Sequence, residues 1–189
     1  MSDRSDFPGD TVWADNFKLY NGVYDDLRFA AAAINPPGLA SDPSRDSDDG
    51  CFLFSATLIN LITIQAQMPH EWAEGTPIVL HLHWSPTNTN TGNVLWRVEY
   101  KIANVGEVFP GSRTTADVLS AGSGTADMHQ IAAWAEVPMT GKKISCMIRI
   151  KISRIGNEVT DTYNANAKLN EFDIHYMKDG LGSVQEYVK

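Results

Sequence analysis

The chain has 189 residues, of which 43% are hydrophobic and 20% charged, a composition typical of one globular domain with its own core. Its formal net charge of −8 at pH 7 argues against nucleic acid as a partner, because phosphate binding needs clustered lysine and arginine. The acidic excess is concentrated in residues 1–50, which hold ten acidic and four basic side chains.

The N-terminal segment is predicted to be an extended arm over residues 1–20, followed by a single domain over residues 21–189. Its start, MSDRSDFPGD, is too polar for a secretory signal, and no apolar run approaches the roughly 20 residues of a membrane span, so we expect synthesis in a cytoplasm and no membrane partner. Residues 13–27 have apolar side chains at helical spacing and are one of the few helix candidates. Residues 35–50, NPPGLASDPSRDSDDG, predict an acidic loop.

Alternation of apolar and polar residues dominates the rest of the chain and predicts strands with one buried face. The first such region is 51–67, with a break near Asn60, and the later runs are 78–84, 94–102, 144–152 and 172–176. Between them, 87–93 predicts a hairpin or loop, 105–125 a long connection and 153–166 a polar loop, while 127–136 fits helix and strand equally. Short strands, long loops and scarce helix predict an all-β fold, an antiparallel jelly roll or β-sandwich with an extended N-terminal arm.

Two cysteines, Cys51 and Cys146, lie 95 positions apart in strand-like contexts. Cys146 falls on the apolar face of its alternating run. We interpret both as reduced core residues.

Paired histidines provide the main candidate for chemistry. His81 and His83 lie two positions apart on a predicted strand and therefore share one face. With Gly75 their spacing is similar to the first half of the cupin motif, whose jelly-roll barrel binds a metal ion, but the resemblance covers only residues 75–83. The glutamate that follows in cupins is absent, and the apolar face of this strand is the opposite one. We therefore expect no metal and no cofactor, and keep His81, His83 and His175 as candidate ligands of an alternative function, a cupin-like metal-dependent enzyme.

Other catalytic patterns are missing, so we expect no catalytic residues and a protein that is not an enzyme. The sequence has no Gly-x-Ser-x-Gly elbow, and neither cysteine has an activating context. Glu171 and Asp173 form a carboxylate pair that we interpret as solvated or as part of an interface ion pair. The acidic run 46–49 is interpreted as a solvated loop rather than a calcium site.

Large aromatic side chains outside the regular strands indicate contacts with other proteins. Trp13, Trp72 and Tyr187 are such residues. Together with His81 and His83 they are our candidate contacts to other subunits or partners.

Three strings of the sequence, QMPHEWAEGT, HLHWSPTNTNTGNVLWRVEY and LNEFDIHYMKDGLGSVQEYVK, resemble small virion structural proteins of tailed bacteriophages, and VYDDLRF resembles the opening strand of that family. The resemblance spans residues 20–189. It implies a non-enzymatic jelly-roll module that forms homotrimers on the particle surface, as capsid decoration (cement), as head fibre or as part of a tail fibre. Its partners would be further copies of itself and the major capsid protein or a neighbouring fibre or tail protein. The implied location is the virion, after synthesis in the host cytoplasm. A glycan- or receptor-binding module of a tail fibre, with a host-surface glycan as partner, is a further alternative.

Overall fold

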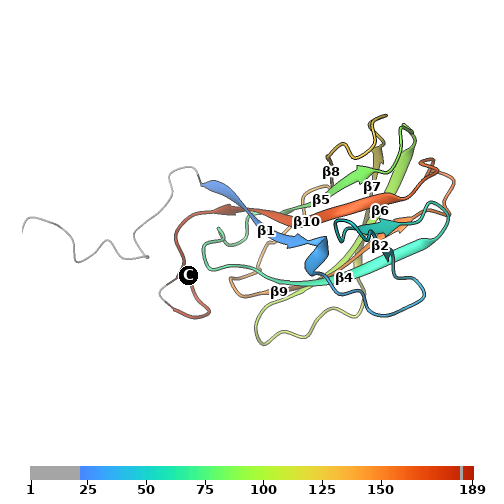
Figure 1. The fold of residues 1–189 in the computed structure, drawn as a ribbon. Coiled ribbons are helices and arrows are strands. Elements are labelled where there is room, and N and C mark those ends of the chain that lie inside the picture. Colours follow the sequence, from blue (N-terminus) through green and yellow to red (C-terminus); the bar gives the residue numbers. More distant parts are fainter. Residues whose placement is uncertain (1–21, 184) are drawn as a thin grey trace, which may run out of the picture.

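Two antiparallel sheets pack face to face in the computed structural model, which describes residues 22–183 and 185–189 (Figure 1). The six-stranded sheet has the order β2 (Ser44–Arg45), β3 (Phe52–Phe54), β10 (Ala167–Lys178), β5 (Val79–Pro86) and β8 (Gln130–Ala133), and β1 (Val23–Ala30) also pairs with β10. The four-stranded sheet has the order β4 (Ile59–Gln67), β9 (Met147–Ile155), β6 (Asn93–Ala103) and β7 (Thr114–Ala121). The predicted all-β antiparallel sandwich of jelly-roll type is confirmed.

Helix is nearly absent from the described residues, which contain one short 3-10 turn, η2 (Ala31–Ala33). No helix in this part of the chain has the length and hydropathy that a bilayer crossing requires. The predicted N-terminal arm, residues 1–20, lies outside the described residues.

The core between the sheets is centred on aromatic side chains from both layers. Trp84 on β5 meets Trp96 on β6 edge-on, with ring centroids 6.2 Å apart. Tyr163 and Phe54 extend the group, at 5.9 Å from Trp84 and 5.2 Å from Trp96 respectively. These large buried surfaces, together with the inward isoleucines of β9, supply the main driving force for packing the two sheets.

One ion pair is completely buried at an end of this core. The inward-facing Arg154 of β9 donates to both carboxylate oxygens of Asp161, at 2.9 and 2.7 Å. Its remaining hydrogens reach the backbone carbonyls of Phe54 at 3.0 Å, Ala165 at 2.6 Å and Tyr163. Because Phe54 belongs to the other sheet, the guanidinium ties the two layers together.

Several expected elements differ from the structure. Residues 23–27, part of the helix candidate, belong to strand β1, in agreement with the opening strand implied by the resemblance. The expected connection 105–125 contains β7, and 127–136 contains β8. The break in 51–67 falls at residues 55–58 rather than near Asn60, which is buried within β4, and β9 runs three residues past 152.

The loop over residues 87–92 connects strands of different sheets, because β5 and β6 belong to separate layers. It is therefore a crossing loop and not a hairpin. In the described residues both cysteines are free thiols. Cys146 is fully buried in the core, as predicted, whereas Cys51 is only half-buried and lies outside the core, so the prediction of a core residue is wrong for Cys51.

Candidate functional site

Four of the five histidines lie on the outer face of the six-stranded sheet. On β5 the inward Leu80, Leu82 and Trp84 alternate with His81 and His83, which confirms the predicted direction of both histidines. The strand register then places carboxylates beside them. We call the group the histidine–carboxylate face; its members are Asp26, His81, His83, His129, Glu171, Asp173 and His175.

Strand pairing explains why these residues meet. Across the β10–β5 pair, Asp173 lies opposite His81 and Glu171 opposite His83. Across the β1–β10 pair, Asp26 lies opposite His175. Facing residues of neighbouring strands have Cβ atoms about 5 Å apart, close enough for side chains to bind each other directly.

Asp173 is the most deeply buried member of the face, with only 3% of the residue exposed. Its Oδ2 lies 2.6 Å from Nε2 of His83, and its Oδ1 lies 3.2 Å from Nδ1 of His81. The second contact is too poorly aligned for a hydrogen bond, so among the described residues Oδ1 has no hydrogen-bond partner. Burial raises the pKa of Asp173, and the neighbouring histidines partly oppose that rise. Of the two interpretations of this carboxylate, the solvated one is wrong for Asp173, because the side chains of His81 and His83 pack against it. The interface ion pair stays a prediction.

A second contact group surrounds His175. Its Nδ1 lies 2.7 Å from Oδ1 of Asp26, and the ring of Tyr24 stacks on it with centroids 4.5 Å apart. The rings of His81 and His175 are 5.2 Å apart, so the two contact groups adjoin.

Both ring nitrogens of His83 are engaged, since Nδ1 lies 2.7 Å from Nε2 of His129 and the two rings stack. Arg28 on β1 donates to both oxygens of Glu171, at 2.8 and 3.0 Å. Asp26, His81 and His175 have fewer such contacts, so they are the part of the face that is more available to a ligand.

The candidate ligands from the sequence, His81, His83 and His175, are thus brought onto one surface, but they fall into two groups. Asp26, His81 and His175 each offer a ligand atom within 4.8 Å of the other two, and so do His83, Glu171 and Asp173. No local sequence pattern pointed to Asp26 as a ligand. The pairing of β1 with β10 joins residues 149 positions apart, and local patterns do not encode it.

The residues predicted to contact other subunits or partners differ in how exposed they are. Trp72 is fully buried, and its indole nitrogen donates to Thr76 at 3.1 Å, so the expectation that it is available to a partner is wrong. Tyr187 is 52% exposed, and the side chains of His81 and His83 are about one-fifth exposed. Trp13 lies outside the described residues.

Asp46 and Asp49, in the acidic run 46–49, lie beside a lysine. The ammonium of Lys168 is 3.3 Å from Asp46, 3.2 Å from Asp49 and 3.2 Å from Asp127. Burial opposes the charge, but the hydrogen bonds to these carboxylates raise the pKa of Lys168. The lysine supplies the positive charge that a bound cation would otherwise bring.

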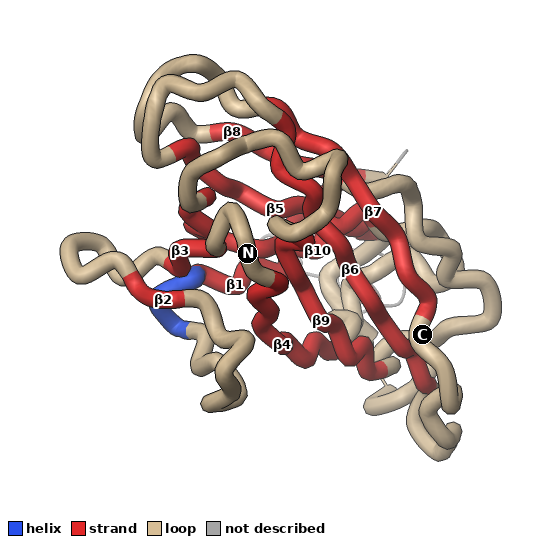
Figure 2. Tube along the Cα trace, turned by 90° about the vertical axis from the view of Figure 1, so that its right-hand side faces the viewer, coloured by secondary structure: helices blue, strands red, loops and turns tan. Residues whose placement is uncertain are grey.

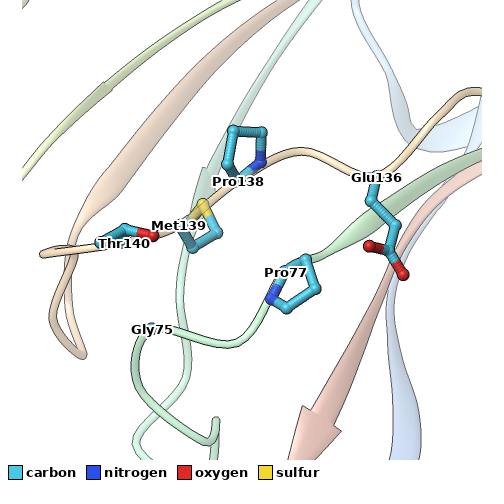
Figure 3. Close-up of a pocket in the computed structure, with 6 residues that line it drawn as sticks. All are labelled: Gly75, Pro77, Glu136, Pro138, Met139 and Thr140. Carbon is cyan, nitrogen blue, oxygen red and sulfur yellow. The ribbon is translucent and has the colours of Figure 1, made fainter.

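A hollow of about 390 Å³ lies between the residues before β5 and those after β8, and no member of the histidine–carboxylate face lines it (Figure 3). It is lined by Gly75, Pro77, Glu136, Pro138, Met139 and Thr140. Glu136 is the only titratable group among these residues, so the lining supplies no acid–base pair.

The free edge of β4 is a second candidate surface. β4 pairs with β9 on one side only, and Figure 2 shows it at the margin of the four-stranded sheet. Its nine residues, INLITIQAQ, contain no charge, proline or glycine, and its register with β9 has no bulge. The backbone N–H of Leu61 points outward and donates to Ser41 at 3.0 Å, so by alternation those of Thr63 and Gln65 also point outward. Neither of these two has a backbone partner among the described residues.

Comparison with known proteins establishes the fold but no family. No protein-family model matches the chain, and no curated protein sequence matches it. Among solved structures, CBM35 from Cellvibrio japonicus Abf62 aligns with 87% of this chain and 99% of its own at 9% identity and a TM-score of 0.50.

Two larger proteins align over part of their length. Isomalto-dextranase of Arthrobacter globiformis T6 shares 16% identity over 79% of this chain, at a TM-score of 0.45. An aminopeptidase from a marine sediment Thaumarchaeota archaeon shares 11% identity over 86% of this chain, at a TM-score of 0.34. The chain spans 23% of the first protein and 34% of the second.

Proposed function

We propose that the protein is a non-catalytic structural module on the surface of a tailed-bacteriophage particle, and that it works as a homotrimer. The similarity of residues 20–189 to small virion structural proteins supports this proposal, and the β-sandwich is compatible with it. Its attachment partner is the major capsid protein or a neighbouring fibre or tail protein, and its location is the virion.

The observation that carries the assembly part of the proposal is the uncharged free edge of β4. Open strand edges pair readily with other strands, and soluble proteins usually protect them with charges, prolines or bulges. The edge strand β1 is protected in this way, because it carries Asp25, Asp26 and Arg28. β4 has none of these features. The loop at Ser41 covers the edge near Leu61, but the outward N–H groups of Thr63 and Gln65 have no backbone partner among the described residues. Leu58 and Ile59 at its start are exposed. An edge of this kind suits a strand that is covered by another subunit.

The oligomeric state of the purified full-length chain tests the proposal. We expect light scattering coupled to gel filtration to give three times the 20.8 kDa of one chain. Thr63→Lys combined with Gln65→Lys adds two charges to the free edge without touching the core, and we expect it to yield monomers. Asn157→Lys with Thr160→Lys, two exposed loop positions, is the matched control and should remain trimeric. A monomeric wild-type protein would refute the trimer, and a trimeric edge variant would refute the role of β4.

Sugar binding is the second candidate function, and it is compatible with assembly on a fibre. It is favoured by the likeness to CBM35 over most of the chain and by Tyr24, which is 60% exposed on the outer face. Exposed aromatic rings stack against apolar faces of sugars as they do against other rings. Glycan-array binding by the assembled protein that disappears in Tyr24→Ala would support this function, and the absence of any bound glycan would argue against it.

A further inference from the structure

Three side chains from three neighbouring strands converge beside Tyr24. Asp26 comes from β1, His81 from β5 and His175 from β10, and each offers a ligand atom within 4.8 Å of the other two. We propose that these three residues bind one divalent transition-metal ion such as Zn²⁺. The proposal concerns a single chain, so it stands or falls independently of the assembly proposed above.

The donor set determines the class of metal. Two imidazole nitrogens and one carboxylate oxygen suit zinc, iron, nickel or cobalt, whereas calcium and magnesium prefer oxygen ligands throughout. The side chains of His81, His175 and Asp26 are 22%, 30% and 40% exposed, so an ion can reach them from solvent. Three protein ligands leave a fourth position open for water or another molecule.

Asp173 provides an independent indication of a ligand at this place. Its Oδ1 is buried, lacks a hydrogen-bond partner among the described residues, and lies 3.2 Å from Nδ1 of His81. Histidines that bind metals commonly donate their other ring N–H to a carboxylate, which fixes the orientation of the ring. A proton on Nδ1 of His81, brought into line by a small rotation of the ring, would satisfy this oxygen and leave Nε2 free for the ion. Asp173 is therefore a positioning residue.

The charge of the face also fits a divalent ion. Arg28 neutralises Glu171 through its two hydrogen bonds. Among the described residues, the carboxylates of Asp26 and Asp173 form no ion pair with a lysine or an arginine. A divalent cation would balance both charges.

The neighbouring group of His83, Glu171 and Asp173 is the poorer site, although its ligand atoms are equally close. Arg28 occupies both oxygens of Glu171, and His83 uses both ring nitrogens. A metal there would have to displace these contacts. This difference makes the two groups distinguishable by substitution.

Calorimetric titration of ZnCl₂ into untagged, full-length protein stripped with EDTA tests the proposal. We expect one ion per chain with a Kd of about 10 µM or tighter. His81→Gln and His175→Gln should each weaken binding by about 100-fold, and Asp173→Asn by roughly 10-fold. His70→Gln is the matched control, because His70 contacts Ser145 and Ser183 away from this face, and it should bind like the wild type. Thermal melts without zinc show whether each variant folds.

CoCl₂ supplies a second readout, because tetrahedral Co²⁺ bound through nitrogen absorbs visible light and free Co²⁺ hardly does. We expect this absorption in the wild type and its loss in folded His175→Gln. A wild-type protein that binds no Zn²⁺ at about 100 µM would overturn the proposal. Binding that survives His175→Gln but is lost in His83→Gln would overturn it equally, because the ion would then belong to the neighbouring group.

Discussion

Replacing Arg154 by methionine is expected to destabilise the fold severely. The substitution keeps most of the apolar stem but removes five hydrogen bonds from a side chain with no exposure to water. Among the residues that the structure describes, it leaves the buried carboxylate of Asp161 with the N–H of Leu95, 3.0 Å away, as its remaining donor. Breaking a buried ion pair in this way costs about 4 kcal/mol. The three backbone carbonyls that lose their donor raise this cost further. The increase is smaller than the sum of three separate hydrogen bonds, because all of them belong to one network.

Urea denaturation followed by tryptophan fluorescence measures this effect. With an m-value of about 2 kcal/mol/M, a loss of about 4 kcal/mol lowers the midpoint by about 2 M. Arg149→Met is the matched control on the same strand, because Arg149 is exposed and its guanidinium lies 3.9 Å from the centre of the Phe109 ring. The control should lose no more than about 1 kcal/mol. If Arg154→Met lost no more than the control, the guanidinium would not tie the two sheets together.

Three further predictions follow from the packing and electrostatics of the sandwich. Burial raises the pKa of the Cys146 thiol to about 11, so a disulfide reagent at about pH 8 should modify it at least 100-fold more slowly in the folded than in the urea-unfolded protein, as read by peptide mass spectrometry. The hydrogen bonds from Arg97 lower the pKa of Asp117, so the carboxylate stabilises the fold above its unfolded pKa and loses this effect as the pH falls through the folded value. Asp117→Asn should therefore lower the free energy of unfolding by roughly 0.5 kcal/mol at neutral pH, and this loss should shrink as the pH falls below the ordinary pKa value of 3.8; an unchanged loss in acid would contradict the assignment. Gly122→Ala would place a Cβ 2.3 Å from a backbone carbonyl oxygen and should cost about 2 kcal/mol or more in thermal melts, whereas Gly111→Ala, with open space around it, should be nearly neutral.

Local alternation was sufficient to predict most of the sandwich and the direction of its histidines. Leu80, Leu82 and Trp84 define the buried face of their strand, so His81 and His83 had to face outward. Strand β7 was not predicted from the sequence. It lies at a sheet edge with most of its side chains exposed, so its sequence, TTADVLSA, shows little alternation of apolar and polar residues.

The candidate site could be predicted only in part, because its assembly depends on which strands are neighbours. His175 was recognisable as a possible ligand, but Asp26 joins it only through the pairing of β1 with β10. Asp173 has the position of a solvated residue in the alternating pattern. Its burial results from rings on an adjacent strand, which one-dimensional patterns do not record. Trp72 shows the same limitation, since it lies outside the named strands yet is fully buried beside β10 through its bridge to Lys178.

The proposed virion role would be tested most directly by electron cryomicroscopy of tailed-phage particles purified from cells that produce this chain. The account predicts density for the sandwich on the particle surface, in groups of three, with the free edge of β4 covered by a neighbouring copy. Particles whose surface lacks this protein, or that carry it as isolated single copies with the β4 edge open to solvent, would contradict the account.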